Sequence, residues 1–273
     1  MYSKIIGHQV EERARSPLIW NELFVKLNIE SEMKRQNLNE DELFAEIHNF
    51  IRTPEYQSIL LAAPLKSAAV RILKEADLHA DNNLESINLI YKINGGIRAT
   101  STDGFGAITS LGITEGKYSF LIMGHGGTSK SIINAILSSI NYHRIIVATR
   151  RPIPNVLEAF PLEFITYDSI EKYLPEVNVI INATTLGNSD NLNSSPINEE
   201  KFTKIGKTTK LLDVNYNDTR TTKFLDIGKK FGISGIDGRH MNLMQALYAF
   251  KLSNPKLTQS VDELFRTGNW QNV

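Results

Sequence analysis

Apolar residues in the first hundred positions recur at both helical and strand spacings. Ser16-Pro17 is typical of a helix start, because serine caps a helix and proline suits its first turn. The apolar positions that follow have helical spacing and predict a helix near residues 17–28: Leu18, Ile19, Leu23, Phe24 and Leu27. Asn39 and the three acids after it predict a second helix near residues 40–52.

A short apolar strand and a hairpin are predicted next. The apolar run at residues 58–63 ends at Pro64, which indicates a buried strand followed by a helix that starts at Leu65 and Lys66. Residues 87–93 and 97–100 flank Asn94-Gly95-Gly96, which is the turn chemistry of a β-hairpin.

From about residue 118 the alternation of strands and helices becomes regular. The pattern predicts one βαβ unit: a strand at 118–123, a glycine loop at 124–127, a helix at 128–140 and a strand at 144–149. Further strands separated by helix-length segments are predicted at 163–166, 177–182, 209–214 and 232–235. This favours an α/β fold with a doubly wound parallel sheet, helices on both faces and a ligand at the carboxyl ends of the strands. The last forty residues are predicted to be helical, including a helix near 260–266.

Length and charge narrow the class of protein. At 273 residues, the chain has room for one large or two modest domains. Its 30 basic and 30 acidic residues cancel, so nucleic acid and anionic membranes are disfavoured as partners, and a small molecule is favoured. The absence of cysteine excludes disulfides and thiol chemistry. The start carries charges rather than an apolar secretory segment, and no apolar run is long enough to span a bilayer, so a cytoplasmic protein is expected.

The glycine loop has the sequence Gly124-His125-Gly126-Gly127, between a predicted strand and a predicted helix. In that context the backbone amides and the helix start suit the pyrophosphate of a dinucleotide, although glycines also simply make a tight turn. Arg150 and Arg151 follow the next strand, where NAD enzymes usually place an acid that binds the ribose. Two arginines favour a 2′-phosphate, and hence NADP, over the alternative of two solvated surface charges.

Metal and serine-nucleophile chemistry find little support. The six histidines have no metal-binding spacing, so no metal site is predicted, and no serine lies in a G-x-S-x-G turn.

A series of short motifs, in order along nearly the whole chain, resembles the shikimate dehydrogenase family (shikimate 5-dehydrogenases). The matching segments are Ala14-Arg15-Ser16-Pro17, Ala62-Ala63-Pro64-Leu65-Lys66, Ser86-Ile87-Asn88-Leu89, Ser101-Thr102-Asp103-Gly104-Phe105-Gly106, Gly124–Gly127, Thr149-Arg150-Arg151, Asn182-Ala183-Thr184-Thr185-Leu186-Gly187, Asp213-Val214-Asn215-Tyr216 and Gly238-Arg239-His240-Met241 with Gln245-Ala246.

The resemblance implies a fold and an activity. Residues 1–104 plus 238–273 would form an α/β substrate-binding domain, and residues 105–237 a Rossmann-type NADP-binding domain. The implied reaction is the NADPH-dependent reduction of 3-dehydroshikimate to shikimate, in the chorismate pathway of aromatic amino acid biosynthesis. The partner is then a small cyclic hydroxy acid, and the protein is expected to be a monomer or a homodimer.

The resemblance also implies roles for individual residues. Lys66 would transfer the proton, and Asp103 would orient Lys66 and the substrate hydroxyl. Without the resemblance, a surface lysine at a helix start and a helix-capping aspartate are the simpler interpretations. Substrate would bind to Ser16, Asn88, Tyr216 and Gln245. NADP would bind to Gly124, Gly126, Gly127, Thr149, Arg150, Arg151, Asn182, Thr184 and Gly238.

The chain departs from the family where the substrate carboxylate is bound. Ala14 and Ala62 replace a serine and a threonine, so two of three hydroxyl donors are missing, and Arg13 or Arg15 are the candidates to compensate. The alternative is a shikimate dehydrogenase-like paralogue that uses quinate or another hydroxy acid, or a non-catalytic dinucleotide-binding protein.

Overall fold

The computed structural model describes residues 1–76, 78, 84–113, 116–150, 162–188, 190–217 and 219–268. The chain divides into two compact units: unit 1 contains Met1–Gly106 and the residues from Asn242 onward, and unit 2 contains Ala107–Met241. The chain passes between the units within two helices, α5 (Asp103–Ser110) and α8 (Gly238–Ser253). The boundaries predicted after residues 104 and 237 fall in the first turn of α5 and just before α8.

Unit 1 is built on a mixed five-stranded sheet with the order β2-β1-β3-β4-β5. Its strands are β1 (Tyr2–Gly7), β2 (Glu32–Asn37), β3 (Tyr56–Leu61), β4 (Leu89–Ile93) and β5 (Gly96–Thr100). β1 runs parallel to β2 and β3, whereas β4 is antiparallel to both β3 and β5.

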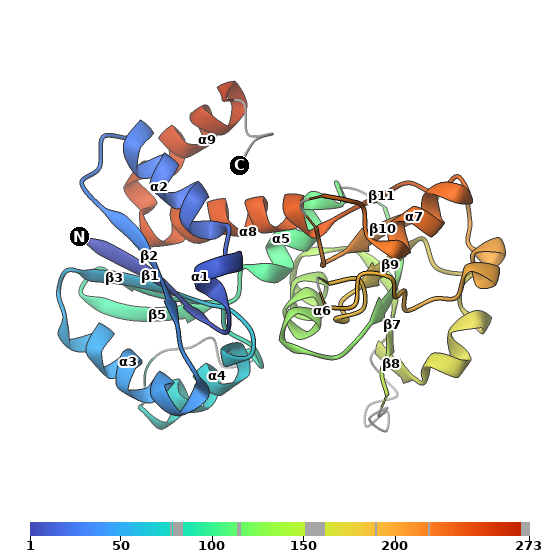
Figure 1. Ribbon diagram of the computed structural model, residues 1–273, viewed down its shortest axis with the longest axis horizontal. Coiled ribbons are helices and arrows are strands. Elements are labelled where there is room, and N and C mark those ends of the chain that lie inside the picture. The colour runs from blue at the N-terminus through green and yellow to red at the C-terminus, as the bar shows by residue number, and fades with distance from the viewer. Residues whose placement is uncertain are drawn as a thin grey trace. The chain divides into compact units, whose positions relative to one another are not determined.

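Helices cover both faces of the unit 1 sheet (Figure 1). They are α1 (Val10–Arg13), α2 (Ser16–Lys26), α3 (Glu40–Arg52), α4 (Leu65–Glu75), the 3-10 helix η3 (Pro255–Leu257) and α9 (Thr258–Thr267). On one face Trp20 of α2 packs edge-on against Phe250 of α8 and donates a hydrogen bond to the carbonyl of Ala246. On the other face Phe50 of α3 packs with apolar residues of α4. A capping box between Asn39 and Glu42 fixes the start of α3.

Unit 2 is built on a six-stranded parallel sheet with the order β11-β10-β9-β6-β7-β8. Its strands are β6 (Tyr118–Met123), β7 (Tyr142–Ala148), β8 (Leu162–Ile165), β9 (Val179–Asn182), β10 (Lys210–Asp213) and β11 (Gly235–Ile236). The helices are α6 (Gly127–Ser139), α7 (Lys223–Lys230) and two 3-10 helices, η1 (Tyr167–Lys172) and η2 (Glu199–Lys204). This strand order is the doubly wound arrangement, which places its topological switch point between β6 and β9.

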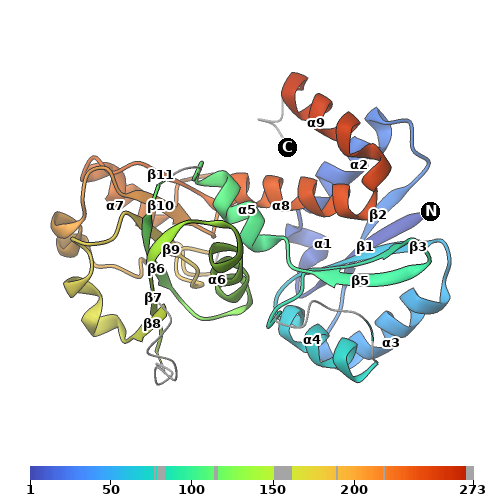
Figure 2. The ribbon, with the colours of Figure 1, turned by 180° about the vertical axis from the view of Figure 1, so that it is seen from behind.

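Two apolar layers sandwich the unit 2 sheet. α6 covers one face, as seen from behind in Figure 2, and its Ile132 and Ile136 pack there. α7, η1 and η2 cover the other face. Among the described helices of both units, none is long and apolar enough to cross a membrane.

The hairpin turn forms at Asn94 and Gly95, both at positive φ (51° and 75°), as the turn chemistry predicts. The structure differs from the predicted elements in three respects. The pattern does not predict β1 and β2, and β2 contains one buried apolar residue, Met33, because it lies at the sheet edge. The last strand begins at Gly235, later than the predicted 232–235, and 3-10 helices replace the α-helices expected on either side of β9.

Candidate active site

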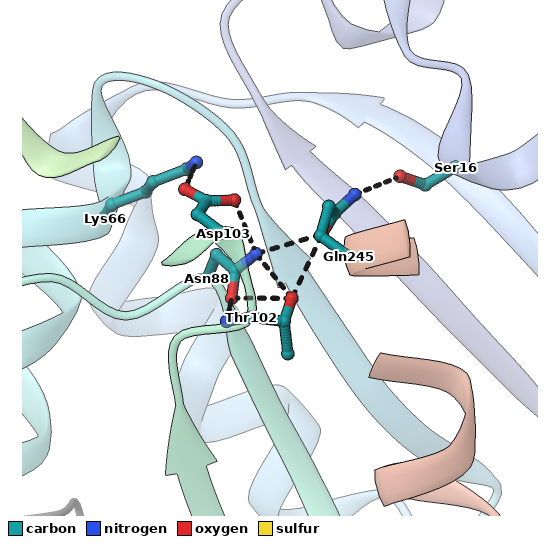
Figure 3. Close-up of polar contacts among 6 residues, drawn as sticks. All are labelled: Ser16, Lys66, Asn88, Thr102, Asp103 and Gln245. Atoms are coloured by element: carbon teal, nitrogen blue, oxygen red, sulfur yellow. Dashed lines mark hydrogen bonds and ion pairs between the residues drawn. The ribbon is translucent and has the colours of Figure 1, made fainter. Parts of the chain in front are cut away.

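Six side chains of unit 1 form one continuous polar network (Figure 3). Lys66 Nζ forms an ion pair with Asp103 Oδ2. The Asn88 amide shares its two hydrogens among three acceptors: Asp103 Oδ1 (2.9 Å), Thr102 Oγ1 (2.9 Å) and Gln245 Oε1 (3.1 Å). Gln245 Nε2 in turn donates to Ser16 Oγ (3.3 Å). The predicted residues Ser16, Lys66, Asn88, Asp103 and Gln245 therefore lie together.

Local backbone structure brings these residues together. Lys66 is the second residue of α4, and its carbonyl accepts a hydrogen bond from Ile87 N (3.0 Å), directly before Asn88. Asn88 precedes β4, and its backbone N–H donates to Thr100 O at the end of β5 (3.1 Å). Pairing of the hairpin strands therefore sets Asn88 beside the segment that leads to Asp103.

Thr102 fixes the orientation of the Asn88 side chain. The backbone N–H of Thr102 donates to Asn88 Oδ1 (2.7 Å), so the Asn88 Nδ2 group points toward Asp103 and Gln245. Thr102 is fully buried, and its hydroxyl also contacts Gln245 Oε1 (3.1 Å). The sequence analysis included Thr102 only as part of the motif around Asp103 and gave it no role. Its place directly before Asp103 is the one sequence feature that could have pointed to it.

The ion pair combines burial with access. The Asp103 side chain is 7% exposed and that of Lys66 is 16% exposed, so the lysine is the more accessible member of the pair. A buried carboxylate needs its counter-ion and its hydrogen-bond donors, and Lys66 and Asn88 supply them. The arrangement is suited to the exchange of a proton at Lys66 Nζ.

Tyr216 and Gly238 belong to unit 2, where a Cβ on Gly238 would lie 2.1 Å from the Val214 carbonyl oxygen, so close approach of the backbone requires glycine. Ala14 and Ala62 of unit 1 are partly buried against its apolar core.

A cavity of about 770 Å³ opens in unit 2 at the carboxyl ends of the strands around the switch point. Its volume is within the range of small-molecule sites. The residues that line it are Gly124, His125, Gly126, Thr149, Arg150, Tyr167, Ala183, Thr184, Thr185, Leu186, Ser195 and Pro196. Of the predicted cofactor residues, Gly127, Asn182 and Gly238 are not in this lining, and Arg151 lies outside the described residues.

The glycine loop is held in one conformation by its surroundings. Gly124 has φ +99°, and a Cβ there would lie 2.7 Å from the Ala183 carbonyl oxygen, so glycine is required. Ser129 Oγ donates to Gly124 O (2.8 Å), which ties α6 back to the loop. A Cβ on Gly126 would meet nothing within 4 Å, so the surface over the N-terminus of α6 is open.

Asn182 holds part of the cavity wall in place. It is fully buried at the end of β9, and its Oδ1 accepts from the backbone N–H (3.1 Å) and the hydroxyl (2.7 Å) of Thr184. Its Nδ2 donates to the Leu186 carbonyl (2.8 Å) and to Asp213 Oδ1 (3.0 Å). Asn182 is thus placed to position the Thr184–Leu186 wall rather than to touch a ligand.

The described lining contains one arginine, the exposed Arg150, one histidine, His125, and no carboxylate. Burial raises the pKa of the neighbouring Tyr167 hydroxyl, while the charge of Arg150 and a backbone group of Gly124 oppose this rise. The glycine backbone, the start of α6 and Arg150 fit a ligand rich in phosphate, as a dinucleotide is. Tyr167, Ser195 and Pro196 were not predicted, because no local motif marks them.

The fold and these two sites define an α/β protein with a Rossmann-type dinucleotide-binding unit and a second unit that carries a buried lysine–aspartate pair. No family model matches the chain. No group of three potential metal-ligating side chains occurs among the residues that the structure describes.

Comparison with known proteins identifies the relatives. The chain is 27% identical over 267 residues to shikimate dehydrogenase (NADP(+)) of Methanosphaera stadtmanae, which covers 92% of this chain and 90% of that protein. It is 28% identical over 276 residues to shikimate dehydrogenase (NADP(+)) of Pelagibacter ubique, with 94% of each covered.

Solved structures agree with these relatives. Shikimate dehydrogenase from Aquifex aeolicus superposes with a TM-score of 0.79 at 23% identity, covering 98% of each chain. Shikimate 5-dehydrogenase from Thermus thermophilus, in complex with NADP(H) and shikimate, gives 0.78 at 22% identity, covering 97% of this chain and 98% of that one. The chain is homologous to the shikimate dehydrogenases and has their fold.

Proposed function

We propose that this protein is an NADP-dependent shikimate dehydrogenase that reduces 3-dehydroshikimate to shikimate. Unit 1 would bind the substrate and unit 2 the cofactor. The observation that carries the proposal is the Lys66–Asp103 ion pair, buried at one end of a network of amide and hydroxyl groups. Shikimate and NADP are proposed as ligands because the relatives are shikimate dehydrogenases (NADP(+)), one of them solved in complex with NADP(H) and shikimate.

The cofactor would supply the hydride of the reaction, and the protein would supply the proton. NADPH supplies the hydride when it is bound. The Lys66 ammonium donates a proton to the carbonyl oxygen as that carbon is reduced, and in the reverse direction Lys66 accepts the proton of the hydroxyl. Asp103 holds the ammonium in place, and Asn88 holds Asp103.

Substrate binding is assigned to the polar side chains nearest this pair. Asn88, Gln245 and Ser16 present amide and hydroxyl groups that suit the ring hydroxyls of a cyclic hydroxy acid. Tyr216 is proposed as a further substrate-binding residue. The proposed partner is a small molecule, and the proposed setting is aromatic amino acid biosynthesis in the cytoplasm, by a monomer or homodimer.

Cofactor binding is assigned to the unit 2 cavity. Gly124, Gly126 and Gly127 would offer backbone N–H groups to the pyrophosphate, and Thr149 and Thr184 would line the same cavity. Arg150 would bind the 2′-phosphate, which favours NADP over NAD. Arg151, Asn182 and Gly238 remain proposed as residues of this site, with Asn182 acting through Thr184.

The proposal is tested by steady-state assays of NADPH oxidation with 3-dehydroshikimate and of NADP reduction with shikimate. Lys66→Ala is expected to lower kcat by about 10²–10⁴-fold, the range of a lost general acid–base group, and Asp103→Asn is also expected to lower kcat, because the ammonium loses the carboxylate that holds it. Lys74→Ala is the matched control, because Lys74 is an exposed lysine on the same helix.

The outcomes separate the proposal from its alternatives. Thermal unfolding of each variant shows whether lost activity reflects lost folding. If the wild-type protein binds NADP but turns over neither shikimate nor 3-dehydroshikimate, the proposal is wrong. Turnover of quinate or another hydroxy acid would then identify a paralogue with a different substrate.

A further inference from the structure

His125 occupies the second position of the glycine loop and lines the unit 2 cavity together with Arg150 and Tyr167. The proposed function gives this histidine no role. Its side chain is half-buried, and it lies where a phosphate-rich ligand would bind. Histidine is the side chain whose ordinary pKa lies closest to physiological pH.

The ring of His125 is held toward one side of the cavity. It packs edge-on against Phe164 of β8, with ring centroids 5.0 Å apart and an interplanar angle of 72°. β8 pairs with β7, where Phe164 lies opposite Val147. Gly124 N also donates to Ala148 O at the end of β7 (2.8 Å). His125 therefore lies on the β7–β8 side of the loop, near the strand end that Arg150 follows.

Among the residues that the structure describes, those that line the cavity around His125 are neutral or positive. Arg150 follows β7, Tyr167 belongs to η1, and β8 contributes the apolar Phe164. The wall after β9 contributes Thr184 and Ser195, which are uncharged. The loop itself ends at the N-terminus of α6, which is the positive end of the helix dipole. A doubly charged phosphate in this cavity would pair with Arg150 and an imidazolium together.

We propose that His125, in its protonated form, binds the 2′-phosphate of NADP together with Arg150, so that the preference for NADP over NAD rises as the pH falls through the histidine range. The proposal deepens the proposed function and rests on it. The 2′-phosphate is favoured over the pyrophosphate because Arg150, Phe164 and the end of β7 lie on the side of the loop toward which His125 is held. The pyrophosphate seat is instead the backbone of Gly126 and Gly127.

The test is calorimetric titration of the full chain with NADP and with NAD at about pH 6 and about pH 8, on either side of the ordinary histidine pKa of about 6.5. The wild-type protein and His125→Gln are compared. His143→Gln is the matched control, because His143 is an exposed histidine on β7. The 2′-phosphate has its own ionisation near pH 6, which is common to all variants, so the difference between variants reports on His125.

The expected result is that the wild-type protein gains about fivefold to tenfold more NADP affinity than His125→Gln between pH 8 and pH 6, as for one charge-assisted hydrogen bond at a partly exposed site. NAD affinity is expected to show no such difference, and His143→Gln is expected to match the wild type. Titrations near pH 7 in buffers of different ionisation enthalpy are expected to show more proton uptake with NADP in the wild type than in His125→Gln.

Each contrary outcome has a distinct meaning. An equal pH effect on NAD and NADP would overturn the assignment to the 2′-phosphate, and an unchanged pH effect in His125→Gln would overturn the role of His125. If NADP binds at neither pH while thermal unfolding shows a folded protein, the cofactor assignment of the proposed function fails instead.

Discussion

At the scale of single residues, Asp213 is a buried carboxyl of unit 2 whose charge state affects stability. It lies at the end of β10, fully buried, and its Oδ1 accepts hydrogen bonds from Asn182 and from the backbone and side chain of Asn215. Its Oδ2 and the nearby Thr222 hydroxyl are buried without a hydrogen-bond partner. Burial raises the pKa of the Asp213 carboxyl, although the hydrogen bonds from Asn215 and Asn182 oppose this rise.

The raised pKa predicts how stability depends on pH. The folded protein binds the Asp213 proton more tightly than the unfolded chain, so this residue's contribution to stability is present below about pH 4 and is lost as the pH rises through the folded-state pKa. Asp213→Asn keeps an acceptor at Oδ1 and adds an amide donor near Thr222. The variant is therefore expected to gain melting temperature relative to the wild type as the pH rises from about 4 to about 7.

Thermal unfolding across that pH range measures the difference. The control variant Asp226→Asn, at an exposed position on α7, accounts for the removal of one negative charge. A difference in melting temperature that stays constant with pH would show that Asp213 does not titrate differently in the folded and unfolded states.

At the scale of secondary-structure elements, the loop between β6 and α6 contains two glycines with different structural requirements. Gly124 is required by the fold, because its φ is +99° and a Cβ would meet the Ala183 carbonyl oxygen. Gly126 is not required by the fold, because its φ is −90° and a Cβ there meets nothing within 4 Å. A side chain at 126 would instead occupy the space over the start of α6.

Substitution by alanine is expected to affect folding at Gly124 and ligand binding at Gly126. Gly124→Ala is expected to destabilise the protein by roughly 2–4 kcal/mol, from backbone strain and overpacking. Gly126→Ala is expected to change stability by less than about 1 kcal/mol but to weaken NADP binding by about tenfold or more. Denaturant unfolding and titration with NADP measure the two effects, and unchanged NADP affinity in Gly126→Ala would contradict a pyrophosphate seat at this loop.

The hairpin, the βαβ unit and the glycine loop could be predicted from sequence because their signals are local. Asn94 and Gly95 tolerate the positive φ of a tight turn, and residues 118–149 carry the periodicity of strand, loop and helix. β2 could not be predicted, because an edge strand buries little and its sequence is mostly polar. The Lys66–Asp103 contact joins residues from different elements, so the family resemblance suggested it where spacing alone did not.

At the scale of the whole molecule, each unit has its own sheet and its own apolar layers, and the chain connects them through α5 and α8. Each unit also contains one of the two candidate sites: the polar network of Lys66 in unit 1 and the cavity of Arg150 in unit 2. Under the proposed function, each ligand is expected to stabilise mainly the unit that contains its binding site.

Hydrogen exchange measured by mass spectrometry is expected to separate the two ligands. A ligand at about 100 times its dissociation constant stabilises the state that binds it by about 2.7 kcal/mol, which slows exchange about 100-fold where that binding controls opening. NADP is expected to protect peptides around Gly124–Lys130, and shikimate is expected to protect peptides around residues 86–103 and Gln245. The Phe44–Ile51 part of α3 contributes to neither site and is the internal reference. If shikimate alone protects the glycine loop and leaves residues 86–103 unchanged, the substrate binds to unit 2. That result would contradict the role given to Lys66.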